Sequence, residues 1–305
     1  MEYSYRAGLH KLLFHQEHIN KIKAGEVVAP IHVTIFPTLA CQLNCAYCFC
    51  RKQYKDGEEL SLEDFTTGID TLAKYGTKAI EFAGGGEPLM WSHFNKAVEL
   101  AYSKGLKLSL ITNGIALKDI PIDILEKFVW IRISVTSIEN IKNVFTSHIP
   151  DKVKVSLSYT IDKLNKRDVR ELYKFAKFKN LITRIAVAQP ATEKDTCKIK
   201  EYIDKFGLPF FFSAKEFGTP QGCYMAWVRG EIDWKGYYLP CPAVMFTTQT
   251  VDDKFRLCHV KDLDQWLINN RVKDLGFKCS FCDCGKEIND FIHTQLKGID
   301  DVEFI

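Results

Sequence analysis

Short apolar runs rich in β-branched residues alternate with longer amphipathic segments from residue 31 to about residue 190. This alternation constrains the fold more than any other feature, because repeated strand–helix units build a parallel sheet with helices packed on it. Between the first two runs, Ser61 and Asp64 form a capping pair typical of a helix N-terminus. Six strands are expected, at residues 32–36, 79–83, 106–111, 129–135, 152–159 and 182–188.

Six strand–helix units are two fewer than a closed eight-stranded barrel contains. We therefore expect an α/β fold built as a partial (β/α)6 TIM-like barrel, open and incomplete. Its functional face is expected at the C-terminal ends of the strands, where the loops that lead into the helices lie.

Three regions are expected along the chain. Residues 1–28 form a helical lead-in with apolar residues at near-helical spacing, and residues 29–195 form the partial barrel. The regular alternation stops after Pro190, and residues 200–305 hold six of the eleven cysteines. Residues 196–305 are therefore predicted to form a small C-terminal α+β domain.

The chain has 41 Lys and Arg residues against 38 Asp and Glu residues, so its charges nearly balance. This balance gives no indication that the protein binds nucleic acid or an anionic membrane. No apolar run approaches the roughly 18–20 residues of a membrane span, and the N-terminal segment lacks the apolar stretch of a signal peptide. We expect a cytoplasmic protein. In a long chain without a secretion signal, eleven cysteines favour metal or cluster binding over disulfides.

Three cysteines, Cys41, Cys45 and Cys48, follow the first expected strand in the stretch CQLNCAYCFC. Thiolates at this spacing can converge on one polynuclear centre, because a loop of this length can wrap around one side of it. A four-iron cluster with three protein ligands keeps one iron open for chemistry. The alternative on spacing alone is a zinc site that also uses Cys50.

A glycine-rich segment, FAGGGEP at residues 82–88, ends the second expected strand. Consecutive glycines let the backbone approach a ligand closely and leave amide and carbonyl groups available for a small polar group such as an amine. Glycine-rich turns are common, so this segment alone is a weak indication of a binding site. It becomes a strong one because it follows the cysteine loop by one strand–helix unit.

Together, the Cys41-x3-Cys45-x2-Cys48 pattern and GGGEP closely resemble the radical S-adenosylmethionine (SAM) enzymes, over about residues 30–190. The resemblance implies that these cysteines hold a [4Fe-4S] cluster, and that SAM binds its fourth iron through its amine and carboxylate. It also implies reductive cleavage of SAM to a 5′-deoxyadenosyl radical. Cys50 is expected near this cluster but not bound to it.

The same resemblance implies further SAM contacts. Tyr47, the aromatic residue before the third cysteine, is expected beside the adenine, and the segment that contacts the methionine amine consists of Gly84, Gly85, Gly86 and Glu87. Ser134 ends the fourth strand, where a polar residue usually meets the ribose or carboxylate, and Asn113 ends the third. Arg132 shares the face of Ser134 in a regular strand and is a candidate partner for the SAM carboxylate or for a salt bridge at the rim. For Ser134 and Asn113 the alternative is a strand-end residue that satisfies backbone groups.

A second set of cysteines lies in the C-terminal region. Cys223 and Cys241 flank an expected β-hairpin with DWKG at its turn, and Cys279 and Cys282 form a C-x2-C pair. Four such cysteines offer a complete site, and by geometry alone either zinc or an iron–sulfur cluster fits it.

The spacing Cys223-x12-Gly236-x4-Cys241 with a later C-x2-C resembles the auxiliary-cluster domain called SPASM in its long form and twitch in its short form. The resemblance implies one auxiliary [4Fe-4S] cluster, for which Cys284 is a possible substitute ligand. Cys258 has no obvious partner; it is a candidate hydrogen-atom donor or a small buried residue. Cys197 is expected to be structural or incidental.

Radical SAM enzymes with such a domain mostly modify peptides, so hydrogen abstraction from a peptide is the first hypothesis. The alternatives are a small-molecule enzyme acting on a sugar, aminocyclitol or nucleotide, modification of a nucleic-acid base, and a non-catalytic iron–sulfur electron carrier. The short chain favours the small-molecule reading modestly, and the balanced charge disfavours nucleic acid. The expected partners are the substrate and an electron donor such as flavodoxin or ferredoxin, without a membrane.

Overall fold

The structure is a computed structural model that describes residues 8–48, 50, 58–138, 141, 148–188, 192–213, 218–244, 253–279, 282 and 285–298. The chain divides into two compact units, each built from segments that are distant in sequence. The first comprises residues 1–35, 60–80 and 215–305, and the second comprises residues 36–59 and 81–214. The three expected regions stay a prediction. In the described part of the chain, every helix is too short or too polar to span a membrane.

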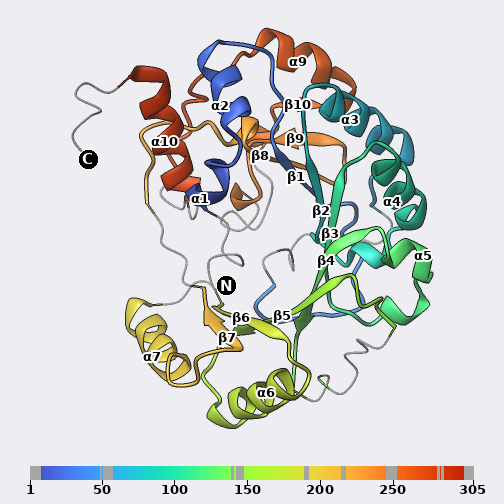
Figure 1. The fold of residues 1–305 in the computed structure, drawn as a ribbon, viewed down its shortest axis with the longest axis vertical. Coiled ribbons are helices and arrows are strands. Elements are labelled where there is room, and N and C mark those ends of the chain that lie inside the picture. Colours follow the sequence, from blue (N-terminus) through green and yellow to red (C-terminus); the bar gives the residue numbers. More distant parts are fainter. Residues whose placement is uncertain are drawn as a thin grey trace. The chain divides into compact units, whose positions relative to one another are not determined.

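Helices and strands alternate through most of the chain (Figure 1). The helices are α1 (Leu9–Leu12), α2 (Gln16–Lys23), α3 (Leu62–Lys74), α4 (Phe94–Ser103), α5 (Ile122–Leu125), α6 (Lys166–Phe178), α7 (Glu193–Ile203), α9 (Leu263–Asn269) and α10 (Gly285–Lys297). Single turns of 3-10 helix are η3 (Pro88–Met90), η4 (Leu117–Asp119), η6 (Met225–Trp227), η7 (Asp253–Phe255) and η8 (Val260–Asp262). The strands are β1 (His32–Ile35), β2 (Ala79–Phe82), β3 (Lys107–Thr112), β4 (Phe128–Val135), β5 (Lys154–Ile161), β6 (Ile182–Val187), β7 (Phe210–Phe212), β8 (Arg229–Ile232), β9 (Tyr237–Leu239) and β10 (Cys258–His259).

The second unit contains an open run of strands in the order β2-β3-β4-β5-β6-β7, with β2 divided between the two units. The pairs from β3 to β7 are parallel. Alternate residues such as Ile131, Ile133 and Leu157 are fully buried, and α4 packs on β3 while α7 packs on β6 and β7. All six expected strands are present, with ends that differ by at most two residues. The expected α/β class with a mostly parallel, open sheet is confirmed.

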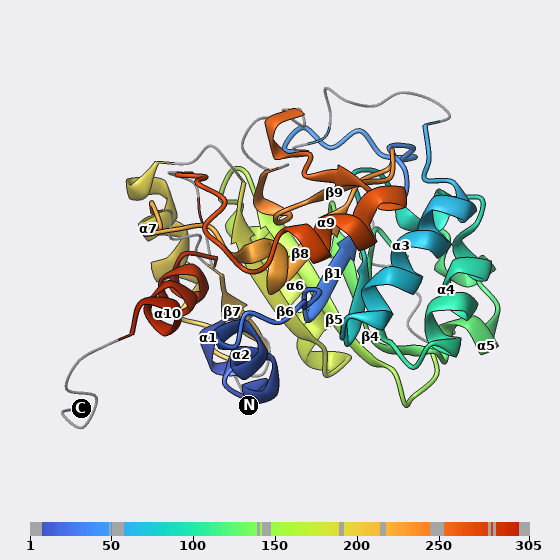
Figure 2. The same ribbon diagram turned by 90° about the horizontal axis from the view of Figure 1, so that it is seen from above.

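The first unit pairs β1 in parallel with β8 (Figure 2), and β9 and β10 follow as antiparallel neighbours. The hairpin expected around DWKG is confirmed as β8 and β9. Its turn is fixed by Asp233, whose carboxylate accepts hydrogen bonds from the Lys235 and Tyr237 amides, each at 2.9 Å. Gly236 in this turn has a φ of 77°, a conformation that favours glycine.

Polar side chains start three of the longer helices. Ser61 accepts a hydrogen bond from the Asp64 amide at the start of α3, as the capping pair predicts. Asn165 caps α6 and Thr192 caps α7 in the same way. Each cap satisfies backbone donors that the first helical turn leaves unpaired, and is worth about 1 kcal/mol.

The glycine segment after β2 lies against the chain that follows β1, within the second unit. The Gly86 amide donates to the Thr38 carbonyl at 2.8 Å, and the Glu87 amide donates to the Ala40 carbonyl at 2.8 Å. A Cβ at Gly86 would lie 2.1 Å from the Ala40 oxygen, and a Cβ at Gly84 would lie 1.7 Å from the Gly86 oxygen. Both distances are shorter than any real Cβ contact, so these positions require glycine. The glycines thereby hold the loops after β1 and β2 together.

Glu231 of β8 is fully buried in the first unit, and neither of its side-chain oxygens has a hydrogen-bond partner among the described residues. Its neighbour Ile232 packs against α3. Because side chains alternate along a strand, Glu231 points to the opposite face of the sheet, on the same side as its register partner Thr34. Burial, and then the nearby Asp233, raise the pKa of the Glu231 carboxyl well above 4.5, while Arg229 acts in the opposite direction. Such a group costs stability, because water no longer solvates it.

We expect Gly86→Ala to lower the free energy of unfolding by roughly 1–3 kcal/mol, the usual cost of forcing extra atoms into a packed site. The added methyl group meets the Ala40 carbonyl, which has to move and weaken its bond to the Glu87 amide. Thermal unfolding of the full chain, followed by circular dichroism, measures the change. Gly8→Ala is the control, because the nearest atom to its Cβ, in His10, would be 4.0 Å away. Equal unfolding midpoints for the two variants would contradict this.

We expect Glu231→Met to raise the free energy of unfolding by about 1–3 kcal/mol, because it replaces an unsatisfied buried carboxyl with an apolar side chain of similar volume. The gain should grow as the pH rises above 4.5, since the folded wild type then retains a proton that the unfolded chain releases. Chemical denaturation at several pH values measures both effects. The matched control is Glu87→Met: Glu87 is equally buried but accepts three hydrogen bonds, so this variant should be less stable. A loss of stability in Glu231→Met would refute the interpretation.

Candidate functional site

The loop after β1 carries Cys41, Cys45 and Cys48, each of which is half-exposed in the second unit. Burial raises the pKa of the Cys45 thiol, and Cys48 and Cys41 act in the same direction, so both of these cysteines lie within electrostatic reach of Cys45. A tight turn links two of them, because the Cys48 amide donates to the Cys45 carbonyl at 3.0 Å. Cys50 differs: it is fully buried, and its sulfur lies beside Gly85.

Tyr47 lies against this cysteine loop. Its hydroxyl hydrogen-bonds the Cys45 sulfur, an interaction that opposes the rise in the Cys45 pKa. Burial raises the pKa of Tyr47, and the negative charges of Cys45, Tyr159 and Asp162 when ionised add to the effect. The hydroxyl is therefore a neutral donor at physiological pH, held between the loop and the C-terminal end of β5.

Glu87 joins the loop after β2 to the end of β3. Its carboxylate accepts hydrogen bonds from the Thr112 hydroxyl at 2.5 Å, the Asn113 amide at 2.7 Å and the Leu89 amide at 3.2 Å. Burial raises the pKa of Glu87, and these donors counteract the rise. The expected contact of Glu87 with SAM stays a prediction, and the carboxylate itself is engaged in bonds within the protein. The Gly86 amide likewise bonds to the Thr38 carbonyl, so the glycine segment helps to shape the loops around the cysteines.

Asn113 reaches from the end of β3 to the cysteine loop. Its side-chain NH2 group lies 4.0 Å from the Cys41 sulfur, and its oxygen accepts hydrogen bonds from the Ile115 amide at 3.0 Å and the Gln42 side chain at 3.4 Å. The loops after β1, β2 and β3 thus meet at the C-terminal ends of the strands, the edge where a functional site was expected.

Two arginines and several serines share one face of β4, β5 and β6. Arg132 and Ser134 alternate with buried apolar residues and are half-exposed, as is Arg184. Ser134 lies opposite Ser158, which in turn lies opposite Arg184. The Arg132 guanidinium sits 5.0 Å from the centre of the Trp130 ring, two residues away on the same face. The expected SAM contacts of Arg132 and Ser134 stay predictions.

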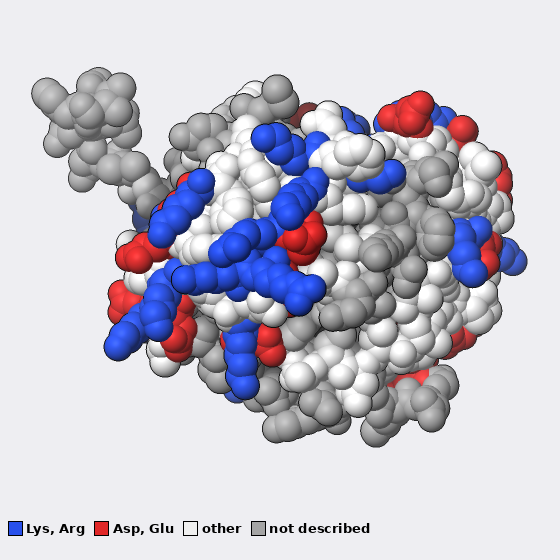
Figure 3. Space-filling view, turned by 90° about the horizontal axis from the view of Figure 1, so that it is seen from below, with Lys and Arg blue, Asp and Glu red and all other residues white. Residues whose placement is uncertain are grey.

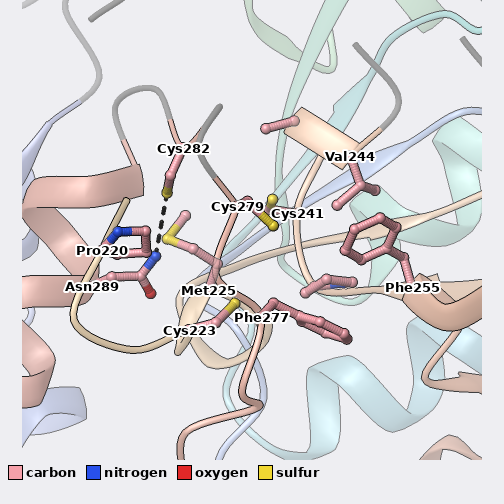
Figure 4. Close-up of a pocket in the computed structure, with 12 residues that line it drawn as sticks. Pro220, Cys223, Met225, Cys241, Val244, Phe255, Phe277, Cys279, Cys282 and Asn289 are labelled. Atoms are coloured by element: carbon pink, nitrogen blue, oxygen red, sulfur yellow. Dashed lines mark hydrogen bonds between the residues drawn. The ribbon is translucent and has the colours of Figure 1, made fainter. Parts of the chain in front are cut away.

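A pocket in the first unit gathers all four cysteines of the expected second set (Figure 4). It encloses about 330 Å³, part of which is open to solvent, and the rest of its lining is mostly apolar. Its cysteines come from the segments before β8, after β9 and before α10: Cys223, Cys241, Cys279 and Cys282. Burial raises the pKa of Cys223 to about 12, and it raises the pKa of Cys241 and Cys279 as well.

Side chains and backbone around this pocket hold its cysteines in place. Asp274 accepts a hydrogen bond from the Cys223 amide at 2.8 Å, and the Cys282 amide donates to the Cys279 carbonyl at 3.2 Å. Asn289 of α10 donates its side-chain amide to the Cys282 sulfur at 3.5 Å. Sequence reasoning did not single out Asn289, although a polar residue beside Ile288 on the buried face of an amphipathic helix was the available signal.

The remaining cysteines lie elsewhere. Cys258 belongs to β10, opposite Tyr238 of β9, and burial raises the pKa of its thiol to about 12. It is not among the residues that line the pocket, and its role as a hydrogen donor stays a prediction. Cys197 is exposed on α7. Cys284 falls outside the described residues.

The described residues contain no group of three His, Cys, Asp or Glu side chains arranged around a single metal ion.

Basic side chains gather over α6 and α7, with acidic ones among them (Figure 3). Lys174 pairs with Glu171 on α6 and Lys200 with Asp204 at the end of α7. Such exposed pairs at helical spacing are typical of a solvated helix face.

Comparison with known proteins gives a family for the part of the chain that carries the first cysteine loop. Residues 35–170 match the family described as the Radical SAM superfamily. The S-adenosylmethionine-dependent nucleotide dehydratase of Selenomonas ruminantium is 38% identical over 110 residues, which cover 35% of this chain and 39% of that protein. The sporulation killing factor maturation protein SkfB of Bacillus subtilis is 29% identical over 113 residues, which cover 36% of this chain and 27% of that protein.

The chain thus spans less than half the length of these curated relatives. Among solved structures, Streptococcus suis SuiB bound to the precursor peptide SuiA has a TM-score of 0.60 at 17% identity, over 87% of this chain and 70% of that one. This likeness shows a shared fold. The residues 35–170 that match the Radical SAM superfamily include the cysteine loop and the glycine segment.

Proposed function

We propose that the protein is a radical SAM enzyme that cleaves SAM reductively and removes a hydrogen atom from a peptide substrate. One observation carries the proposal: three half-exposed thiols lie in a single loop, which the glycine segment holds at the C-terminal ends of the strands. Three half-exposed thiols at this edge, with a fourth cysteine buried beside them, support a cluster that has three protein ligands and one open metal position.

The first site fits a [4Fe-4S] cluster. Its donor set consists of the thiols of Cys41, Cys45 and Cys48, which a single loop carries. In the proposal these three residues hold the cluster, and the buried Cys50 does not. Such a cluster supplies the electron that breaks a carbon–sulfur bond of SAM and yields the 5′-deoxyadenosyl radical.

The residues around this loop are proposed to position SAM. Tyr47 offers its ring beside the loop, and Asn113, Arg132 and Ser134 offer polar groups at strand ends. The glycine segment contributes its shape, since a side chain at Gly86 would displace the neighbouring loop.

The pocket of the first unit is proposed to hold one auxiliary [4Fe-4S] cluster. Four thiols in a mostly apolar pocket match the four-cysteine ligation of such clusters. The ligands in the proposal are Cys223, Cys241, Cys279 and Cys282. Burial favours the protonated thiols, so cluster binding has to displace their protons.

A peptide substrate is supported by the names of two relatives: a maturation protein from Bacillus subtilis, and SuiB with a precursor peptide bound. A nucleotide is the second candidate, because the relative with 38% identity is a nucleotide dehydratase and because Arg132 and Arg184 face the same side as serines that can bind phosphate. Stimulation of SAM cleavage by a precursor peptide, compared with nucleoside triphosphates, separates the two. A flavodoxin or ferredoxin as electron donor and a cytoplasmic location also stay predictions.

We expect Cys45→Ala to abolish release of 5′-deoxyadenosine from SAM in the presence of dithionite, because the first cluster loses one of three ligands. The measurement uses the anaerobically reconstituted full chain and chromatographic detection of the product. Cys50→Ala is the matched control from the same loop, and it should retain both the product and the iron of the first cluster. Failure of a fully reconstituted wild type to release 5′-deoxyadenosine would refute the proposed function.

We expect Cys241→Ala to retain SAM cleavage while the iron content falls from about eight to about four atoms per chain, since each [4Fe-4S] cluster contributes four. Iron analysis after anaerobic reconstitution gives the content, and product analysis shows whether substrate modification stops. Cys197→Ala, on the exposed surface of α7, is the control and should keep all the iron. About four irons in the wild type itself would rule out the auxiliary cluster.

A further inference from the structure

Asn289 is a polar residue with no exposed surface in the interior of the first unit. It lies on the buried face of α10 between Ile288 and Ile292, and it lines the cysteine pocket (Figure 4). Burying an amide at such a position is costly unless both of its ends are hydrogen-bonded. The partners of Asn289 therefore indicate why the pocket contains it.

The contacts of Asn289 fix the orientation of its amide. Its oxygen accepts a hydrogen bond from the Tyr224 backbone N–H at 2.6 Å, and a backbone N–H can only donate. The NH2 group must then face the other way, toward the Cys282 sulfur at 3.5 Å. If the amide were turned around, its NH2 group would face the Tyr224 N–H, and two donors would oppose each other. The Cys282 sulfur would also lose its hydrogen bond from Asn289.

The same amide links the two ends of the cysteine set. Tyr224 directly follows Cys223, the first cysteine of the pocket, whereas Cys282 lies near its end in sequence. The Cys282 sulfur is also closely surrounded, since a Cβ at Gly285 would lie 3.1 Å from it. The sulfur thus has a defined position and a defined donor.

We propose that Asn289 is a positioning residue that orients the Cys282 sulfur and raises the reduction potential of the auxiliary cluster. The proposal rests on the proposed function, because it requires a cluster at this pocket. Reduction adds one electron, and the negative charge spreads onto the ligand sulfurs. An N–H···S hydrogen bond stabilises the more negative, reduced state more than the oxidised one, and such bonds are among the determinants of cluster potential.

The test compares the reduction potential of the auxiliary cluster in the wild type and in Asn289→Leu, by redox titration of the reconstituted full chain followed by electron paramagnetic resonance. We expect the equilibrium constant for one-electron reduction to fall about tenfold in the variant, which corresponds to a potential lower by about 59 mV. The potential of the first cluster should not change. A purely structural role for Asn289 would leave both potentials at their wild-type values.

Two further variants make the result interpretable. Thr294→Val removes a neutral hydroxyl from α10 that bonds to a backbone carbonyl, and it should leave both potentials unchanged. Asn289→Ala deletes the donor without adding bulk and should lower the auxiliary potential as Asn289→Leu does. Unchanged potentials in both Asn289 variants, or loss of auxiliary iron from both, would overturn the proposal. A wild type with only about four irons would instead refute the auxiliary cluster itself.

Discussion

The arrangement of the first site depends on a backbone contact that only glycine permits. Gly86 comes so close to the Ala40 carbonyl that even a methyl group would displace it, and the amides of Gly86 and Glu87 bond to the chain between β1 and the cysteine loop. Glu87 extends the same contact to Thr112 and Asn113 at the end of β3. Loops from three successive strands are thereby held in one place, and the thiols of Cys41, Cys45 and Cys48 are presented from a fixed base.

The sequence predicted much of this arrangement, because its features are local. Strand–helix alternation, the spacing of Cys41 to Cys48 and the DWKG turn each depend on residues that are close together in the chain, and the expected strands and hairpin are present. The pairing of β1 with β8 was not predicted, since it joins residues almost 200 positions apart and β8 has only four residues. The use of the Glu87 carboxylate within the protein, and the Glu231 carboxyl without a hydrogen-bond partner among the described residues, each follow from tertiary packing and leave no pattern in the sequence.

The two cysteine sites place their thiols in different surroundings. Cys41, Cys45 and Cys48 are half-exposed, and Cys41 and Cys48 both influence the pKa of Cys45. The second set is buried enough to raise the pKa of Cys223 to about 12. A buried thiol is a poor ligand until a metal displaces its proton, so metal binding at the second set has to release protons that burial retains.

The first unit is built from segments that are distant in sequence, and this affects the order in which the two units can fold during synthesis. During translation, at about 5–20 residues per second, β1 and α3 leave the ribosome long before the segment that carries β8 to β10 and α10. The segments of the second unit are all available once residue 214 has been synthesised. Its cysteine loop can therefore take shape before the segment with Cys279 and Cys282 has been made, so the two cysteine sets can form one after the other on a growing chain.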